Sequence, residues 1–298
     1  MAVEAISIGS QERTWLSQRT RVRAWRLLGY LALVVLVIAI GAPVYWMLTA
    51  SVKSNAEIYT FPPQWIPSNP RWANFQDAWN AAPFDRFYIV SIVTTLFGTG
   101  LELVNATLTA YALAFLRFPF KNLVFVIILA TLMVPTQLTI IPNYLTISDV
   151  PLIHSNWINT YQGIILPGAA VAFGTFMLRQ GFLGLPREVL DAAKVDGAGH
   201  LRTLWDIAIP MAKPIIVTFG LISMVAKWND YLWPLIVTNE ERMRPLAVGV
   251  SYLNDPDGNT QWGMVMAAVF FVIAPLIVVY IFAQRYIIEG IAAGATKG

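Results

Sequence analysis

The stretch "EVLDAAKVDGAGHLRTLWDIAIP", residues 188–210, stands out because it is charged and lies between very apolar segments. Apolar positions recur at helical spacing on both sides of Gly197, the kind of residue that ends a helix in the left-handed conformation. The pattern predicts two short helices joined at that glycine. Because the surrounding chain is apolar, residues 186–210 are expected to form a water-facing hairpin.

Each predicted helix of this hairpin has an apolar stripe. Pro186 suits the first helical position, where its missing N–H is not needed, and Pro210 suits the end of the second helix. The first stripe is formed by Leu190 and Ala193, and the second by Leu201, Leu204, Trp205 and Ala208. A hairpin of this size cannot bury both stripes by itself, so it needs a partner surface or the lipid headgroup region.

Composition defines the broad class of the protein. Of its 298 residues 57% are hydrophobic and only 12% are charged, against about 25% in soluble domains. There is no cysteine, which excludes a disulfide framework. Six segments approach or exceed the roughly 20 apolar residues that cross a bilayer. They are 27–50, 87–115, 122–145, 159–178, 214–238 and 262–284. The sequence therefore predicts an all-α polytopic membrane protein with six transmembrane helices.

The distribution of Lys and Arg predicts the orientation. With six spans both termini lie on one side, together with the turn at 116–121 and the hairpin. That side carries fourteen of the 20 Lys and Arg residues, including the Arg-rich stretch 1–26. We therefore expect both termini and the hairpin of this multi-pass protein in the cytoplasm.

The third predicted span contains "MVPTQLTIIPNYL", residues 133–145. Each of its two prolines removes a backbone donor, so the helix must kink or break. Two interpretations stay open: a kink that serves packing only, or the wall of a polar pathway, since freed carbonyls in a membrane need a partner. In the second case Gln137, Asn143 and Tyr144 would line the pathway.

Two outer loops are also unusual. Residues 61–84 are rich in Pro and Trp, which suits a belt at the membrane–water boundary or part of a docking surface for an external partner. Residues 238–261 are polar and too long for a simple turn. We expect this second loop to contact an external protein.

The fifth predicted span contains Lys227 and Asp230, and the second contains Glu102. Ionisable residues within spans are costly and usually functional. One interpretation is a local pair, because Lys227 and Asp230 lie three residues apart on a helix. The other is that Lys227 lines the outer end of a polar pathway together with Asn229, Asp230 and Tyr231, where its charge favours an anion.

The hairpin resembles the EAA motif of binding-protein-dependent ABC importer permeases, E-A-A-x3-G-x9-I-x-L-P. Here the motif reads Asp191-Ala192-Ala193, Gly197, then Ile207-Ala208-Ile209-Pro210, with the spacing intact. Two positions depart conservatively from the pattern, with Asp in place of Glu and Ile in place of Leu. Other segments resemble the six-span second permease of maltose-type, carbohydrate-class importers. They are 110–122, 133–145, 227–235 and 289–298.

The resemblance covers roughly residues 27–298 and leaves 1–26 as an Arg-rich tail without a counterpart. It implies a type I importer core of the MetI-like kind, in which residues 186–210 are a coupling helix that contacts the ATPase. It also implies a location in the inner membrane of a bacterial or archaeal cell. The coupling residues implied in this way are Asp191, Ala192, Ala193, Asp196, Gly197, Ala198, Leu201, Ile207 and Pro210. The implied partners are a second, homologous permease, two ATPase subunits, an extracytoplasmic solute-binding protein, a small-molecule substrate and membrane lipid, but no nucleic acid.

The chain itself has no recognisable catalytic, nucleotide-binding or metal-binding motif. The closest approach to a P-loop, "GATKG" at 294–298, lacks its spacing and context. We therefore expect no cofactor in this chain, with ATP and Mg²⁺ bound by the partner ATPases. An ion-coupled secondary transporter, based on the ionisable residues in the spans, and a multi-span membrane enzyme are the alternatives. The resemblance favours a sugar or a glycerol-phosphate-type solute without deciding between them.

Overall fold

The computed structural model describes residues 2–255 and 258–295, with side chains described for 21–255 and 258–284. Within these residues every regular element is a helix, and one isolated antiparallel bridge joins Val150 to Ser155. The predicted all-α class is therefore confirmed.

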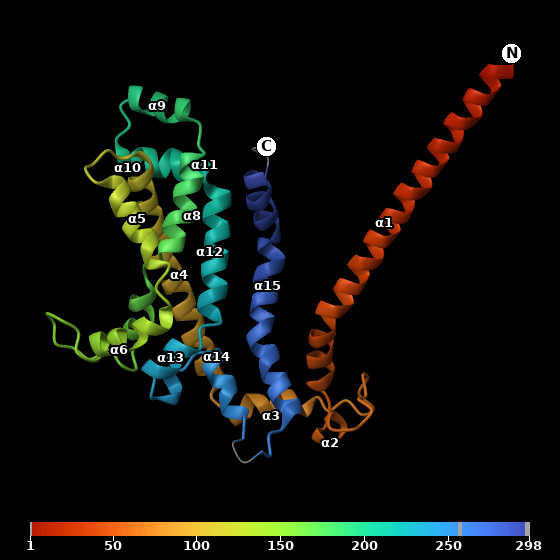
Figure 1. Cartoon of the computed structure of the whole chain (residues 1–298). Coiled ribbons are helices and arrows are strands. Elements are labelled where there is room, and N and C mark those ends of the chain that lie inside the picture. The colour runs from red at the N-terminus through yellow and green to blue at the C-terminus, as the bar shows by residue number, and fades with distance from the viewer. Residues whose placement is uncertain (1, 256–257, 296–298) are drawn as a thin grey trace.

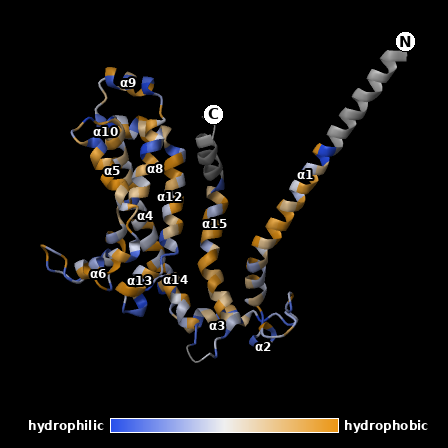
Figure 2. Ribbon diagram, viewed as in Figure 1, coloured by the Kyte–Doolittle hydropathy of each residue, from blue (hydrophilic) through white to orange (hydrophobic). Residues whose placement is uncertain are grey.

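Three helices are long and apolar enough to cross a membrane without a break. They are α1 (Ala2–Ala50), α4 (Phe84–Phe115) and α15 (Trp262–Ala295). Figure 2 shows the apolar surface along α1 and α15. The backbone of α1 is helical from Ala2, so the Arg-rich tail predicted at 1–26 continues directly into the first span, with Met1 outside the described residues.

Three further candidate spans are bent pairs of helices, which gives up to six spans when each pair is counted as one. The segment Lys121–Thr131 meets Thr136–Ser148 at 92°, and Tyr161–Gly168 meets Ala172–Leu183 at 49°. The segment His200–Met211 meets Lys213–Trp228 at 81°. Their elements are α5 (Lys121–Thr131), η1 (Thr136–Thr139), α6 (Ile140–Ser148), α7 (Tyr161–Ile165), η2 (Leu166–Gly168), α8 (Ala172–Leu183), α10 (His200–Thr203), η3 (Leu204–Ala208), α11 (Ile209–Met211) and α12 (Lys213–Trp228).

The third span breaks at one of its two prolines. Pro135 lies directly before η1 in an extended conformation, at the 92° bend. Pro142 lies in the first turn of α6, where a missing N–H leaves no helical hydrogen bond unmade. The prediction of a break is confirmed, and the structure assigns it to Pro135.

The fifth predicted span, 214–238, is wrong in its outer part. Helix α12 ends at Trp228, and the chain turns before α13 (Leu232–Val237). The side chain of Asn229 donates to the Val225 carbonyl at 2.8 Å, which satisfies a backbone group freed at the helix end. As a result Lys227 and Asp230 do not lie on one continuous helix.

Helix α4 lies at the centre of the packed helices and contacts both α8 and α12 (Figure 1). Close approach is possible because of small residues: a Cβ added at Gly174 of α8 would lie 2.2 Å from the Phe219 ring of α12. In lipid, such close packing takes over much of the role that the hydrophobic effect has in water. Buried residues of this cluster are Ala106, Ala110, Leu178, Phe182 and Phe219.

Several short elements gather at the end of the molecule opposite the hairpin helix α9 (Arg187–Val195), as Figure 1 shows. We call this end the outer platform. It contains α2 (Asn55–Ile58), α3 (Ala73–Ala81), α13, η4 (Glu241–Met243), α14 (Leu246–Gly249) and η5 (Val250–Leu253).

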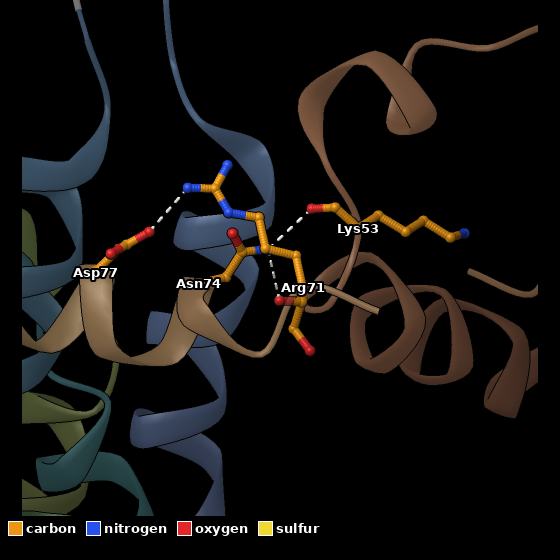
Figure 3. A network of polar contacts seen from close by, with 5 residues as sticks. Lys53, Arg71, Asn74 and Asp77 are labelled. Carbon is orange, nitrogen blue, oxygen red and sulfur yellow. Dashed lines mark hydrogen bonds and ion pairs between the residues drawn. The ribbon is translucent and has the colours of Figure 1, made fainter. Parts of the chain in front are cut away.

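A buried lysine fixes the junction of α1 with the outer platform (Figure 3). The Lys53 side chain is fully buried, its ammonium donates to the Gln64 carbonyl, and it lies 4.3 Å from the ring centroid of Trp46. Burial lowers the pKa of Lys53, an effect partly opposed by the negative charge of Glu57. The Asn74 amide donates to the Lys53 carbonyl at 2.8 Å, so α3 is attached to the same turn.

The loop 238–261 is not an open polar loop. Its middle folds inward, with Leu246 and Val248 fully buried, and the Leu246 N–H donates to the Ser91 hydroxyl of α4 at 2.8 Å. Exposed surface is left at the two ends of the loop, 239–242 and 251–259, of which residues 256–257 are outside the described part.

Candidate functional site

The first candidate site is the hairpin, and its turn is built as the sequence predicts. Gly197 has a φ of 76°, the left-handed conformation that favours glycine. Its N–H donates to the Lys194 carbonyl at 3.0 Å, and the Ala198 N–H donates to the Ala193 carbonyl at 2.9 Å. These two bonds form a Schellman motif, which fixes the direction in which the chain leaves α9.

The start of α9 differs by one residue from the prediction. Pro186 is in an extended conformation and precedes the helix, so Arg187 is the first helical residue. The charged face of α9 carries an ion pair, in which Lys194 Nζ lies 2.7 Å from Asp191 Oδ1, three residues earlier. This hydrogen bond and the positive charge of Lys194 lower the pKa of Asp191, so the carboxylate is ionised at neutral pH.

The second half of the hairpin departs from a regular helix. Residues Leu204–Ala208 form a π-helical turn, and the helix continues to Met211 instead of ending at Pro210. The wider turn shifts the faces, so that Leu204 and Ala208 are buried while Leu201 and Trp205 are exposed. The second predicted apolar stripe is therefore divided in the single chain, and its exposed part, Leu201 and Trp205, is what remains for a partner surface or the headgroup region.

The outward surface of the hairpin combines charges with uncovered apolar side chains. Val195 is 88% exposed and Leu201 is 70% exposed, whereas Leu190 and Ala193 face inward. Most of the predicted coupling residues lie on the accessible side. Asp191, Ala192, Asp196, Gly197, Leu201 and Pro210 are exposed, Ala198 and Ile207 are half-buried, and Ala193 is buried. Such a surface suits a protein partner, because apolar groups and charges are both presented on a rigid frame.

The second candidate site is a cavity of about 580 Å³ between the broken spans and α12. The breaks in the third and fourth spans both contribute to it. The third span contributes Val134 and Thr136, and the fourth contributes Pro167, Gly168 and 170–172. Four of the predicted pathway residues line this cavity. They are Gln137, Asn143, Lys227 and Asp230.

The other three predicted pathway residues lie elsewhere. Tyr144 borders a smaller neighbouring pocket with Ile140, Ile141 and Ile236. Asn229 caps the end of α12, and Tyr231 is the residue before α13, 42% exposed. The structure thus brings residues of four predicted spans, the second to the fifth, to one cavity, with a polar wall formed by the ends and breaks of helices.

The ion pair that Lys227 makes is with Glu102 of α4, 3.4 Å between Nζ and Oε2, so the local pair with Asp230 is wrong. Glu102 is nearly buried and also accepts a hydrogen bond from the Ser223 hydroxyl, one turn before Lys227 on α12. Lys227 Nζ donates to the Gly168 carbonyl at 2.9 Å. One feature of the sequence pointed to this partner of Lys227, namely the isolated acid Glu102 within an apolar span.

Other residues around Lys227 could not be recognised from the sequence. Ser223, Gly98 and Gly168 are ordinary residues of spans, and only the tertiary arrangement gives them a role. Two buried hydroxyls on α4, Thr95 Oγ1 and Thr99 Oγ1, have no partner among the described protein groups. Buried hydroxyls without a protein partner are sites where water binds in a polar interior.

The sequence matches the family model described as "Binding-protein-dependent transport system inner membrane component" over residues 106–292. It is 33% identical over 269 residues to the sn-glycerol-3-phosphate transport system permease protein UgpE of Yersinia enterocolitica, covering 88% of this chain and 94% of that protein. It is 34% identical over 274 residues to the protein of the same name from Rhizobium meliloti, covering 89% and 95%.

The fold is similar to that of solved transporters. A chain of a bacterial ABC transporter involved in the import of the acidic polysaccharide alginate has a TM-score of 0.77, with 24% identity over 89% of this chain and 96% of that chain. A chain of a bacterial alginate ABC transporter in complex with an alginate pentasaccharide-bound periplasmic protein has a TM-score of 0.63, with 14% identity over 88% and 94%.

Proposed function

The chain belongs to the binding-protein-dependent transport system inner membrane component family, and on this premise we propose that it forms half of the membrane pathway of an ATP-driven importer. The other half would be a second, homologous permease. Support comes from α1, whose residues 21–40 are all exposed in the single chain. A long apolar helix without neighbours needs lipid or another subunit around it.

The structure of the hairpin is the observation that supports a role in coupling ATP hydrolysis to transport. A charged, capped helix with a fixed turn stands at the end of an apolar helix bundle, and its outward face has exposed Val195 and Leu201. A rigid element of this kind transmits force from a partner better than a flexible loop. One of two ATPase subunits would dock here, the other would dock on the second permease, and both would bind ATP and Mg²⁺, while this chain binds no cofactor.

This assignment requires the hairpin and both termini to lie in the cytoplasm. The Lys and Arg distribution supports this orientation. Helix α15 runs from the outer platform towards the α9 end of the molecule, which agrees with it (Figure 1). The outer platform would then face a solute-binding protein outside the membrane.

For the substrate we propose a glycerol-phosphate or a related anionic solute, with a neutral sugar as the alternative. Two relatives of about one-third identity are named as glycerol-3-phosphate permeases. The transporter of similar fold imports an acidic polysaccharide. The cavity offers polar side chains, among them Gln137 and Asn143, for such a solute.

The test is transport by a reconstituted complex of this chain, its partner permease, the ATPases and the binding protein. Vesicles would be offered radiolabelled sn-glycerol 3-phosphate, a glycerophosphodiester, maltose and trehalose, with and without ATP. Uptake that needs ATP and persists with a protonophore supports the importer. Uptake that needs an ion gradient instead of ATP would establish the ion-coupled carrier, and turnover of a substrate without uptake would establish the membrane enzyme.

A further inference from the structure

The fourth span is interrupted inside the bundle, between the end of η2 at Gly168 and the start of α8 at Ala172. Carbonyl groups freed at such a break need hydrogen-bond partners, because lipid offers none. The Gly168 carbonyl accepts from Lys227 Nζ at 2.9 Å, and the Ala169 carbonyl accepts from Asn105 Nδ2 at 2.9 Å. The break is therefore held by α12 through Lys227 and by α4 through Asn105.

The charge of Lys227 is compensated on its other side. Glu102 Oε2 lies 3.4 Å from Nζ, and the Glu102 side chain is only 6% exposed. The Ser223 hydroxyl, also on α12, donates to the same carboxylate. We call Lys227, Glu102 and Asn105 the intramembrane clamp. Because its two opposite charges meet, the clamp puts no unpaired charge into the spans.

Two glycines make room for the lysine. A Cβ at Gly98 of α4 would lie 2.7 Å from Lys227 Cδ, and a Cβ at Gly168 would lie 3.3 Å from Nζ. The side chain thus passes between the backbone of α4 and the backbone of the break. This narrow space positions the ammonium group at one carbonyl. A lysine that binds a solute would instead need free space around its ammonium group.

Helix α12 connects this clamp to the hairpin. It begins at Lys213, two residues after α11 ends, and runs unbroken to Trp228. The 81° bend with His200–Met211 joins it to the second half of the hairpin. At 1.5 Å per residue, the clamp lies roughly 20 Å from the hairpin end of α12. A displacement of the hairpin that moves α12 as a rigid body also moves Lys227.

We propose that Lys227, with Glu102 as its counter-ion, is a positioning residue that ties the break in the fourth span to α12, so that hairpin movement reaches the cavity wall. The inference rests on the proposed function, because it assumes that the hairpin is moved by ATPase subunits. Gly168 and residues 170–172 at the break line the cavity, so a shift of this segment changes the cavity directly.

The test uses nitroxide labels, which the absence of cysteine in the chain makes specific. One label is placed at Ala170, which is exposed and lines the cavity, and in a separate sample one at Val195 on the hairpin. Spectra of the assembled complex, with cysteine-free partner subunits, are compared without nucleotide and after trapping with ATP and vanadate. The unsubstituted chain should show a change at both labels.

The Lys227→Met/Glu102→Gln double variant neutralises both members of the ion pair together, so neither of them is left as an uncompensated charge, and the protein should assemble. We expect the spectral change of the Val195 label to be as large as in the unsubstituted chain. The spectral change of the Ala170 label should fall by about fivefold or more, because coupling between distant sites typically amounts to a factor of at least about five. If the Ala170 response keeps its full size, or is absent in the unsubstituted chain, the inference is wrong. Should the double variant fail to assemble, Asn105→Leu removes the other donor without a charge, and a retained response there overturns the clamp.

Lys121→Met is the matched control. Lys121 also binds freed carbonyls, those of Ala114 and Leu116 at the hairpin end of α4, but it does not line the cavity. In Lys121→Met the spectral changes of both labels should be intact. If the Ala170 label loses its response in this control, the effect comes from a general destabilisation of the helix bundle, and the proposal is wrong. The labels need no transported solute. A failure to take up glycerol 3-phosphate therefore counts against the proposed substrate alone.

Discussion

The hairpin and the intramembrane clamp are built from interactions of very different range. In the hairpin, Lys194 pairs with Asp191 three residues away, and the Schellman bonds span a single turn. In the clamp, Lys227 bonds a carbonyl 59 residues away, and Ser223 bonds an acid 121 residues away. The hairpin can therefore move as a preformed unit, whereas the clamp exists only when three helices are assembled.

The glycines of the two regions differ in the same way. A Cβ at Gly197 would meet nothing within 4 Å, and what the position needs is its positive φ. At Gly98 a Cβ would meet the Lys227 side chain. The hairpin glycine supplies conformation and the span glycine supplies space, so the same kind of substitution should fail for different reasons at the two positions.

The largest expected effect comes from breaking the hairpin turn. Gly197→Pro cannot adopt the positive φ and removes the N–H that donates to Lys194, with a local cost of about 3 kcal/mol or more. We expect ATP-dependent uptake to fall to background while the amount of protein in the membrane is unchanged. Uptake and membrane abundance are measured together.

Gly199→Pro is the matched control for this variant. Gly199 has a φ of −70°, which a proline ring adopts, and a Cβ there meets nothing within 4 Å. It should keep most of the uptake. Normal uptake by Gly197→Pro at normal abundance would show that the hairpin geometry is not needed for coupling.

The next effect concerns the charge on the hairpin surface. Asp191→Lys replaces the ion pair with Lys194 by a repulsion and reverses a charge that faces the proposed ATPase. We expect transport to fall by at least about tenfold, because like charges across an interface are costly. Co-purification of the ATPase and stimulated hydrolysis are the measurements. Asp206→Lys, which breaks the exposed pair with Arg202, is the control and should be mild.

The dependence on pH sharpens this prediction. Because Lys194 lowers the pKa of Asp191, the stabilisation from their pair is present above the ordinary carboxyl pKa and is lost only as the pH falls through the lowered value. Transport by the unsubstituted chain should therefore not change through Asp191 between neutral and mildly acidic pH. If the unsubstituted complex loses its ATPase during purification at mildly acidic pH, the titration of another group must be the cause.

What could be predicted from the sequence follows this difference in range. The turn at Gly197, the helix α9 and the broken third span are set by signals within a few residues, and all three were predictable. The partner of Lys227 was not, because the end of α12 at Trp228 has no strong stop signal and one sequence does not show which distant acid approaches. The π-helical turn at 204–208 was missed for a similar reason, since the burial of Leu204 and Ala208 by neighbouring helices selects that register.

A smaller effect is expected in the narrow space of the clamp. Gly98→Ala places a Cβ against the Lys227 side chain, and overfilling of this kind costs about 1–3 kcal/mol. We expect a lower thermal stability of the purified complex and a weaker response of the label at Ala170. Gly100→Ala, two residues along the same helix with open space around it, should be neutral. Equal stability of the two variants would mean that Lys227 moves aside without loss.

The smallest expected effect tests the outer platform, which the comparison of hairpin and clamp leaves out. Only the ends of the loop 238–261 are accessible, and Glu241 is exposed in η4 at one of them. Glu241→Lys should weaken the apparent affinity with which the loaded binding protein stimulates ATP hydrolysis by about threefold at low salt, because rim charges act mainly on association. Basal hydrolysis should be unchanged, since the substitution touches neither the hairpin nor the clamp. The same assay at high salt is the control, because screening should remove most of the difference. An unchanged apparent affinity at low salt would mean that this end of the loop lies outside the docking surface.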